Sequence, residues 1–329
     1  MLTCDPLAQL ASVLHDDLEA TNALIRERMA SAHAPRIPEV TAHLVEAGGK
    51  RIRPLLTLAC ARMLGCRGDH HVRLAAAVEF IHTATLLHDD VVDESRTRRG
   101  RPTANLLWDN KSSILVGDYL FARSFRLMVE TGSLRVLDIL SQAAAVIAEG
   151  EVLQLTTAQN LATDEATYLR VIRGKTAALF QAACEAGAVI AGGDEPAIAA
   201  LGRYGDALGL CFQIVDDLLD YGGVSAVLGK DVGDDFRERK VTLPVILAHG
   251  RGDAQERAFW QRVIARGDQR EGDLAHAQAL MRRHGALEET RARALAMAET
   301  ARAALDGLPG GEIRRLLHDL AGFVVARVA

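Results

Sequence analysis

The sequence predicts an all-α protein, and three features of its 329 residues support this fold class. Apolar residues recur at helical spacing along most of the chain, whereas the alternation typical of strands is scarce. Only 8 residues are proline and only 4% are aromatic, while Ala, Leu, Arg and Glu abound. No linker, low-complexity tract or short repeat interrupts the pattern. We therefore expect about a dozen helices in a single domain that covers residues 1–329.

The first half of the chain contains three long periodic segments. We expect helices over 5–31 and 38–64, separated by a break at Pro35 and Pro38. An apolar, proline-free run predicts a helix over 71–93, and a basic loop follows it.

A second apolar run predicts a helix over 194–220, which the glycines of Tyr221-Gly222-Gly223 terminate. Residues 222–235 are then expected to form the main loop of the second half. The remaining periodic segments predict helices over 109–129, 134–159, 163–171, 175–191, 241–249, 252–265, 271–285, 287–307 and 311–325.

Composition excludes several classes of protein. The net charge of −5 provides no basic surface for nucleic acid. The five cysteines are odd in number and have no metal-type spacing, which favours a reduced, cytoplasmic compartment. The N-terminus lacks the apolar segment of a signal peptide, and no apolar run approaches the length of a membrane span.

The motif Asp-Asp-x-x-Asp occurs twice, at 89–93 and at 216–220. The first and last Asp of each copy are four residues apart and therefore share a helix face, where like charges repel. Each copy also ends an apolar helix, which is the negative end of the helix dipole. A bound cation resolves both conflicts. Mg²⁺ fits because it takes a few carboxylate oxygens and completes its shell with water and substrate phosphates.

Basic residues accompany both acidic clusters, as phosphate binding requires. They are Lys50 and Arg53, Arg98 and Arg99, Lys175, and Lys230 and Lys240. The i, i+3 spacing of Lys50 and Arg53 predicts that both project from one helix face.

Together these motifs resemble the trans-type isoprenyl diphosphate synthases, the polyprenyl synthetase family, over about residues 40–250. The matching motifs are Gly49-Lys50-Arg51-x-Arg53-Pro54, Leu87-His88-Asp89-Asp90-x-x-Asp93, Arg98-Arg99-Gly100, Gly174-Lys175-Thr176, Phe212-Gln213-x-x-Asp216-Asp217-x-x-Asp220 and Lys240-x-Thr242-Leu243-Pro244. The run from Phe80 to Asp89 is most similar to the long-chain members that make quinone side chains. The chain departs from the family at Arg239, where many members carry glycine, and at Asp231, where a neutral residue or proline is usual. Both departures weaken the assignment of Lys240.

The resemblance implies an isoprenoid-synthase-type helical bundle around a deep central cavity, in a homodimer. It implies a prenyltransferase that joins isopentenyl diphosphate head to tail (1′–4) to an allylic diphosphate, farnesyl diphosphate being the expected starter. The expected product is an all-trans chain of octaprenyl to decaprenyl length for ubiquinone biosynthesis, released with peripheral membrane contact.

The same resemblance assigns roles to individual residues. Magnesium is expected at Asp89, Asp93 and Asp216, with three ions when substrate is bound. The catalytic set also includes Asp90, Lys175, Asp217 and Asp220. The allylic diphosphate is expected among Arg98, Lys175, Thr176, Gln213, Lys230 and Lys240. Isopentenyl diphosphate is expected at Lys50, Arg53, His82 and Arg99.

Product length is expected to depend on the helix wall below Asp89. Ala84 and Thr85 lie just over one helical turn before Asp89, and both are small, so a growing chain passes them. Ile81 lies further down the same wall, and we expect the floor near Leu127 or Met128. The alternative is that Ala84 only permits tight helix packing.

Other functions stay open at this stage. They are a shorter-chain farnesyl or geranylgeranyl diphosphate synthase, a class I terpene cyclase, a non-catalytic synthase subunit and a purely structural helical protein. A cyclase normally carries an Asn/Asp, Ser/Thr and Glu pattern in its second metal motif, and a non-catalytic subunit loses aspartates that this chain keeps.

Several residues have two interpretations. His82 alone is more typical of a core histidine, and His88 is either an outer partner of a ligand carboxylate or a cation at the helix end. Asp234 and Asp235 either order water at a third metal ion or cap a short turn. Asp16 and Asp17 are expected at the surface of an amphipathic helix.

Overall fold

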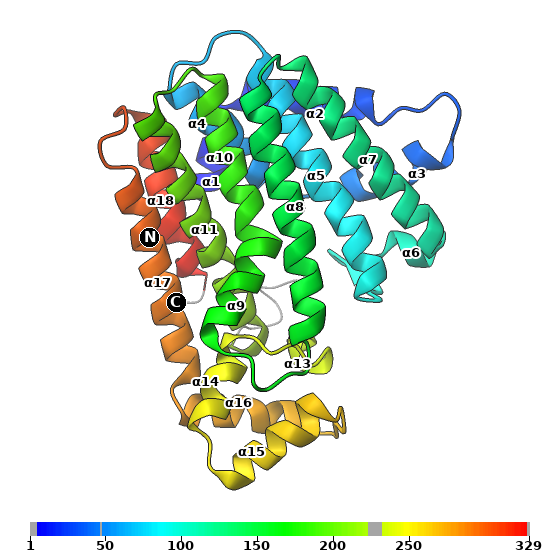
Figure 1. Cartoon of the computed structure of the whole chain (residues 1–329), viewed down its shortest axis with the longest axis vertical. Helices are drawn as coiled ribbons and strands as arrows, with labels where there is room; N and C mark the ends of the chain where they lie inside the picture. The colour runs from blue at the N-terminus through cyan, green and yellow to red at the C-terminus, as the bar shows by residue number, and fades with distance from the viewer. Residues whose placement is uncertain (1–4, 47, 223–231, 328–329) are drawn as a thin grey trace. The chain divides into compact units, whose positions relative to one another are not determined.

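The computed structural model describes residues 5–46, 48–222 and 232–327, which fold almost entirely as α-helices (Figure 1). One antiparallel hairpin, β1 (Thr97–Arg98) with β2 (Arg101–Pro102), is the only sheet in this described part. The all-α prediction is confirmed. Each helix in the described ranges is too short or too polar to cross a bilayer.

The chain divides into two compact units. Unit 1 comprises Met1–Ala144, Leu179–Gly202 and Gly307–Leu317. Unit 2 comprises Ala145–Ala178, Arg203–Asp306 and His318–Ala329. A single domain over residues 1–329 stays a prediction.

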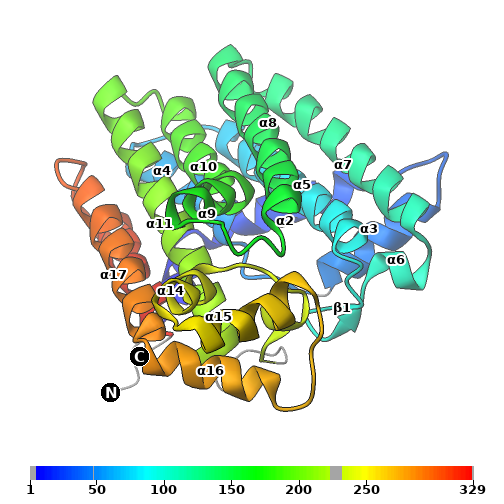
Figure 2. The same cartoon turned by 60° about the horizontal axis from the view of Figure 1, so that its bottom comes forward.

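Unit 1 is built around two buried helices. Its helices are α1 (Pro6–Val13), α2 (His15–Arg28), α3 (Arg36–Glu46), α4 (Ile52–Met63), α5 (His70–Val92), α6 (Ala104–Leu107), α7 (Asn110–Glu130) and most of α10 (Ala178–Ile190). Residues 54–61 of α4 and 74–81 of α5 are all buried. Helix α7 runs beside α5 (Figures 1 and 2). The core of unit 1 therefore lies along α5, the helix that ends in the first acidic motif.

Unit 2 holds the second acidic motif. Its helices are α9 (Glu165–Ile172), α13 (Asp234–Arg237), α14 (Leu243–Arg251), α15 (Ala254–Trp260), α16 (Asp273–Arg283) and α17 (Ala286–Ala304). Helices α8 (Leu134–Thr157), α11 (Glu195–Gly222) and α18 (Glu312–Ala326) contribute residues to both units. Trp260, Tyr221 and Phe236 anchor an apolar cluster where α14, α15 and α16 gather (Figure 2).

Two segments predicted as single helices are broken. The segment 5–31 is interrupted at Leu14, where the backbone (φ −104°, ψ 23°) leaves helical geometry. The segment 38–64 is interrupted before α4, where Gly48 (φ 74°) and Arg51 (φ 49°) are left-handed. Because α4 begins at Ile52, the prediction that Lys50 and Arg53 share a helix face is wrong.

Some short elements were not predicted from the sequence. They are the β1–β2 hairpin, α6, α13 and two π-helical turns at Arg173–Ala177 and Gln261–Ala265. The hairpin turns at Arg99 and Gly100, whose φ values of 53° and 75° are the two positive values that a type I′ turn requires. The basic loop that follows α5 is thus a defined turn that carries Arg98 and Arg99.

The prediction that Asp17 lies at the surface is wrong. Its carboxylate accepts two hydrogen bonds of 2.6 Å from Arg62 of α4. The side chain of Asp17 is only 14% exposed, because α2 packs against α4 and α5. Periodicity within α2 could not reveal this partner, which lies 45 residues away in the chain.

We predict that Gly187→Ala destabilises unit 1, because a Cβ at Gly187 of α10 would lie 2.6 Å from the carbonyl oxygen of Thr57 in α4. Forcing the two backbones apart should lower the free energy of unfolding by ~1–3 kcal/mol in chemical denaturation. Gly250→Ala is the control, since nothing lies within 4 Å of a Cβ there and alanine favours the helix. Equal stability of the two variants would contradict the close packing of α4 and α10.

Candidate active site

The three aspartates of the first acidic motif differ in how deeply they are buried. Asp89 and Asp93, at the end of α5, are half-buried, while Asp90 is fully buried. Arg98 donates two hydrogen bonds, from Nε at 2.9 Å and Nη2 at 2.8 Å, to Oδ1 of Asp90. Asp90 therefore ties the β1–β2 hairpin to α5, whereas Asp89 and Asp93 are partly exposed.

A cationic cluster lies two turns earlier on α5, around His82. Arg53 of α4 approaches His82 with 3.2 Å between Nη1 and Nε2, and its guanidinium lies 4.6 Å from the ring centre of Phe180. Because a guanidinium can only donate, Nε2 of His82 is the acceptor and its proton resides on Nδ1. The structure thus brings together Arg53 and His82, two residues predicted to share one ligand.

The electrostatics of this cluster favour an anion. Burial lowers the pKa of Arg53 to about 10, and repulsion from Arg99 adds to this, while Glu79 opposes it. Arg53 therefore stays charged at neutral pH. Burial, and next the charge of Arg53, hold the pKa of His82 well below 6.5, so the imidazole is neutral. Arg99 lies beside Gly49, where a Cβ would meet its Nη1 at 2.8 Å.

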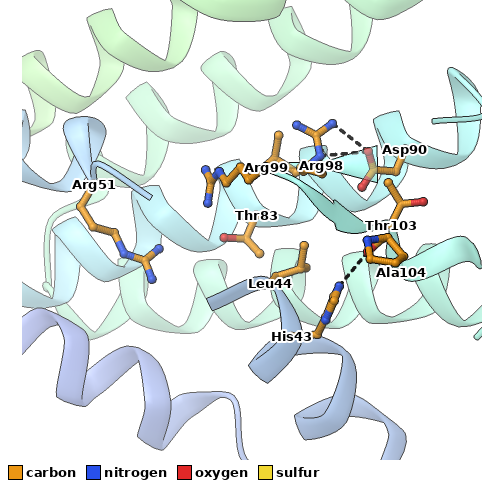
Figure 3. Close-up of a pocket in the computed structure, with 11 residues that line it drawn as sticks. His43, Leu44, Arg51, Thr83, Asp90, Arg98, Arg99, Thr103 and Ala104 are labelled. Atoms are coloured by element: carbon orange, nitrogen blue, oxygen red, sulfur yellow. Dashed lines mark hydrogen bonds and ion pairs between the residues drawn. The ribbon is translucent and has the colours of Figure 1, made fainter. Parts of the chain in front are cut away.

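Next to this cluster is a pocket lined by three arginines (Figure 3). Its lining residues are His43, Leu44, Arg51, Thr83, Leu86, Asp90, Arg98, Arg99, Pro102, Thr103 and Ala104. Figure 3 shows Arg98 turned toward Asp90, while Arg51 and Arg99 extend toward the same side of the pocket. His43 contacts the carbonyl oxygen of Pro102 at 2.9 Å and so joins α3 to the hairpin.

Two residues of this region received no role from the sequence. Arg51 forms an ion pair with Glu79, a buried carboxylate on α5. Glu79 stands out in the sequence as an acid inside an apolar run, three residues before His82. That signal identifies a buried charge but not its partner, which lies on another helix.

In unit 2, the middle aspartate of the second motif is also turned inward. Asp217 is buried and accepts hydrogen bonds from the hydroxyl of Tyr168 (2.6 Å) and the amide of Gln213 (2.8 Å). Gln213 in turn accepts a 2.8 Å bond from the hydroxyl of Thr176. Burial raises the pKa of Asp217 to about 6, although both hydrogen bonds oppose the shift. Tyr168 was missed by the sequence analysis.

The last aspartate of the second motif, Asp220, accepts backbone N–H bonds from Asp234 (3.1 Å) and Asp235 (3.0 Å). It therefore holds the start of α13. The carboxylate of Asp235 lies 3.8 Å from Nζ of Lys240, which also pairs with Glu238. Asp216 is half-buried.

Lys175 and Thr176 lie in the π-helical turn that joins α9 to α10. Nζ of Lys175 lies 3.1 Å from the carboxylate of Glu151 on α8. The turn packs directly on α8, because a Cβ at Gly150 would meet the backbone nitrogen of Lys175 at 2.7 Å. Single π turns in α-helices are frequent at functional sites.

The remaining predicted residues have simple positions. Ala84 and Ile81 are fully buried on α5, and the hydroxyl of Thr85 donates a 2.8 Å bond to the carbonyl of His82. Lys50 is exposed just before α4. Lys230 lies outside the described residues. Leu127 and Met128, the predicted floor, are both buried on α7.

His88 faces α7 rather than a carboxylate of its own motif. Its Nε2 lies 3.2 Å from the carbonyl oxygen of Ile114 and 3.4 Å from Asp118. A Cβ at Gly117 would collide with this imidazole at 2.3 Å, so the glycine allows α5 and α7 to meet there.

Comparisons with known proteins cover nearly the whole chain. A family model for polyprenyl synthetases matches residues 34–281. The octaprenyl diphosphate synthase of Haemophilus influenzae is 43% identical over 99% of this chain and 98% of its own length.

Two solved structures are closer still. A decaprenyl diphosphate synthase from Rhodobacter capsulatus superposes with a TM-score of 0.95, at 68% identity over 98% of this chain and 99% of its own. A polyprenyl synthase from Caulobacter crescentus, complexed with calcium and isoprenyl diphosphate, superposes with a TM-score of 0.94, at 52% identity over 98% of each chain.

We predict that His82 makes stability depend on pH. The unfolded histidine takes a proton near pH 6.5, whereas the half-buried imidazole of the folded protein does so only at lower pH. The stability that neutral His82 contributes is therefore complete above 6.5 and is lost as the pH falls below it. Between about pH 6.5 and 5.5 the free energy of unfolding should fall by up to ~1 kcal/mol more in the wild type than in His82→Gln. Parallel pH profiles of the two proteins, measured by urea denaturation, would refute this.

Proposed function

Because the chain belongs to the polyprenyl synthetase family, we infer that it is a prenyltransferase that makes long-chain all-trans polyprenyl diphosphates from isopentenyl diphosphate and an allylic diphosphate. One observation of geometry carries the inference. Helix α5 ends at the half-buried carboxylates of Asp89 and Asp93, and about 10 Å earlier along its axis it carries His82, which Arg53 of α4 contacts. Unit 1 thus presents carboxylates at the end of α5 and, two turns earlier, a cationic contact between α4 and α5, as a reaction between two diphosphates requires.

The donor set of the first motif fits magnesium. Asp90 is buried against Arg98, and Asp89 and Asp93 are half-buried carboxylates about one helical turn apart. Over the described ranges, no three acidic, His or Cys side chains converge into a closed metal cage. A cation here must complete its shell with water and substrate oxygens, which is the preference of Mg²⁺. As the family resemblance implies, we assign Asp89, Asp93 and Asp216 to magnesium ions, three of which are expected when substrate is bound. Magnesium supplies positive charge that stabilises the departing diphosphate.

The chain's own residues position the two substrates. We assign the allylic diphosphate to Arg98, Lys175 and Lys240, with Lys230 joining them. Thr176 and Gln213 are assigned to the same diphosphate; the hydroxyl of Thr176 donates to Gln213, whose amide donates to Asp217. Isopentenyl diphosphate is assigned to Lys50, Arg53, His82 and Arg99.

The reaction needs no nucleophilic side chain. The bond between the allylic carbon and the diphosphate oxygen breaks, and the cations around the leaving group stabilise its charge. The double bond of isopentenyl diphosphate attacks the resulting allylic cation and forms the new carbon–carbon bond. One proton then leaves, and we assign the departing pyrophosphate as its acceptor. Apolar walls along α5 keep water from the cation.

The assembly and location of the enzyme are further parts of the proposal. Large apolar side chains on α6 and α7 are exposed, which supports a homodimer through this face; they are Leu106, Leu107, Ile114, Leu115 and Val129. The four cysteines in the described ranges are buried and unbridged, which supports a reduced, cytoplasmic compartment. Farnesyl diphosphate as the starter and peripheral membrane contact during release complete the proposal.

The direct test is product analysis. The pure protein is incubated with labelled isopentenyl diphosphate and farnesyl diphosphate, with magnesium or with excess chelator, and the products are sized. We expect long linear chains with magnesium and none with chelator. A cyclic hydrocarbon would indicate a terpene cyclase. Chains no longer than geranylgeranyl would indicate a shorter-chain synthase, and the absence of any product would indicate a non-catalytic subunit.

Asp89→Ala and Asp216→Ala should each lower kcat by several orders of magnitude and raise KM much less. Each substitution removes a metal ligand that acts as charge develops on the leaving diphosphate. Steady-state kinetics measure both constants, and Asp16→Ala, an exposed carboxylate on α2, is the control. If either variant kept wild-type turnover, the assignment of that aspartate to the metal would be wrong.

Lys50→Ala and Arg53→Ala should raise the KM for isopentenyl diphosphate and leave the KM for the allylic substrate nearly unchanged. Both residues are assigned only to the site for isopentenyl diphosphate. Varying each substrate at a saturating level of the other measures the two constants. A main effect on the allylic substrate would show that our division into two phosphate sites is wrong.

Ala84→Phe should keep activity and shift the products to much shorter chains, because a bulky side chain one turn below Asp89 closes the passage. Ala84 is fully buried, so overpacking by ~1–3 kcal/mol is the competing outcome, in which the variant loses activity and stability together. Product sizing and circular dichroism distinguish the two. An active variant that makes the wild-type product would show that the chain does not pass Ala84.

A further inference from the structure

Glu79 is a buried acid near the arginines of unit 1. It lies on α5, is only 6% exposed, and precedes His82 by three residues, so both project from one face of the helix. Its partner is Arg51, whose side chain is 16% exposed. A buried carboxylate is retained at such a place only when it is paired.

Arg51 has an unfavourable backbone. Its φ of 49° is left-handed, a region that non-glycine residues rarely adopt and that persists only where surrounding contacts hold it. The residue immediately precedes α4 and makes no side-chain cap for that helix. The ion pair with Glu79 anchors the side chain of Arg51 to α5, while its carbonyl oxygen accepts the N–H of Leu55 at 2.9 Å.

Glu79 also counters repulsion among the arginines. The charge of Arg51 destabilises the charged form of Arg99, whereas the charge of Glu79 stabilises it. Glu79 stabilises the charged form of Arg53 in the same way. The neighbouring carboxylate, Asp90, is already bound by Arg98. Glu79 is thus an internal anion that keeps these cations gathered before a diphosphate arrives.

We propose that Glu79 is a positioning residue for isopentenyl diphosphate, which acts through Arg51 to hold the segment 48–53 and its cations in binding geometry. This rests on the proposed function, in which Lys50 and Arg53 bind that substrate. A purely structural role for Glu79 would change stability and leave the affinity for the substrate unaltered.

The test uses the full chain and the isosteric variant Glu79→Gln. Binding of isopentenyl diphosphate is measured by isothermal titration calorimetry without the allylic substrate, and KM is measured for both substrates well below the melting temperature. We expect Kd and KM for isopentenyl diphosphate to rise about tenfold, as loss of one charge-assisted contact predicts, with less than about a twofold change for the allylic substrate. Glu130→Gln is the matched control, because Glu130 also binds an arginine, Arg28, in unit 1. It should leave both substrates unaffected.

A second variant covers the case in which Glu79→Gln does not fold. Arg51→Lys keeps the charge balance and removes the guanidinium fork, so it should weaken isopentenyl diphosphate in the same way. Wild-type affinity in a folded Glu79→Gln or Arg51→Lys protein, while Lys50→Ala and Arg53→Ala bind weakly, would overturn the role of Glu79 alone. Wild-type affinity in all four variants would overturn the assigned substrate site as well.

Discussion

Helix α5 buries ionisable side chains along an otherwise apolar core helix, and each of them takes a partner from another segment. Glu79 binds Arg51 before α4, His82 accepts from Arg53 within α4, and Asp90 accepts from Arg98 on the hairpin. A buried charge without a partner is strongly unfavourable, so these contacts are obligatory. Two of the cations that we assign to the substrates, Arg53 and Arg98, are therefore placed by side chains of α5.

The two acidic motifs share this principle but use different partners. Asp90 is neutralised by a guanidinium, whereas Asp217 relies on the neutral donors Tyr168 and Gln213. Neutral donors offset burial less completely, which is why the pKa of Asp217 rises to about 6. In both motifs the middle aspartate holds local structure. The first aspartate, Asp89 or Asp216, is half-buried and remains within reach of a ligand.

Two of the arginines that line the pocket also have strained backbone conformations. Arg51 and Arg99 both adopt left-handed φ values, 49° and 53°, although neither is glycine. Such conformations cost of order 1 kcal/mol or more each and persist where surrounding contacts impose them. Here a buried ion pair holds Arg51, and a two-residue hairpin turn holds Arg99. Both arginines line the pocket of Figure 3.

The sequence by itself determined the all-α class and most of the long helices, and it identified the two acidic motifs as candidate metal sites. Helical periodicity is local, and the i, i+4 spacing of Asp89 with Asp93 defines a shared face without reference to any other segment. The tertiary structure alone decided which charged side chains are buried against a partner from another segment and which are partly exposed. It turned Asp17 inward to Arg62, moved Lys50 off α4, and supplied Glu79 and Tyr168 as partners that no local pattern indicated. The physical reason is that a hydrogen bond or ion pair depends on distance in space, and its two members here lie 28 to 49 residues apart in the chain.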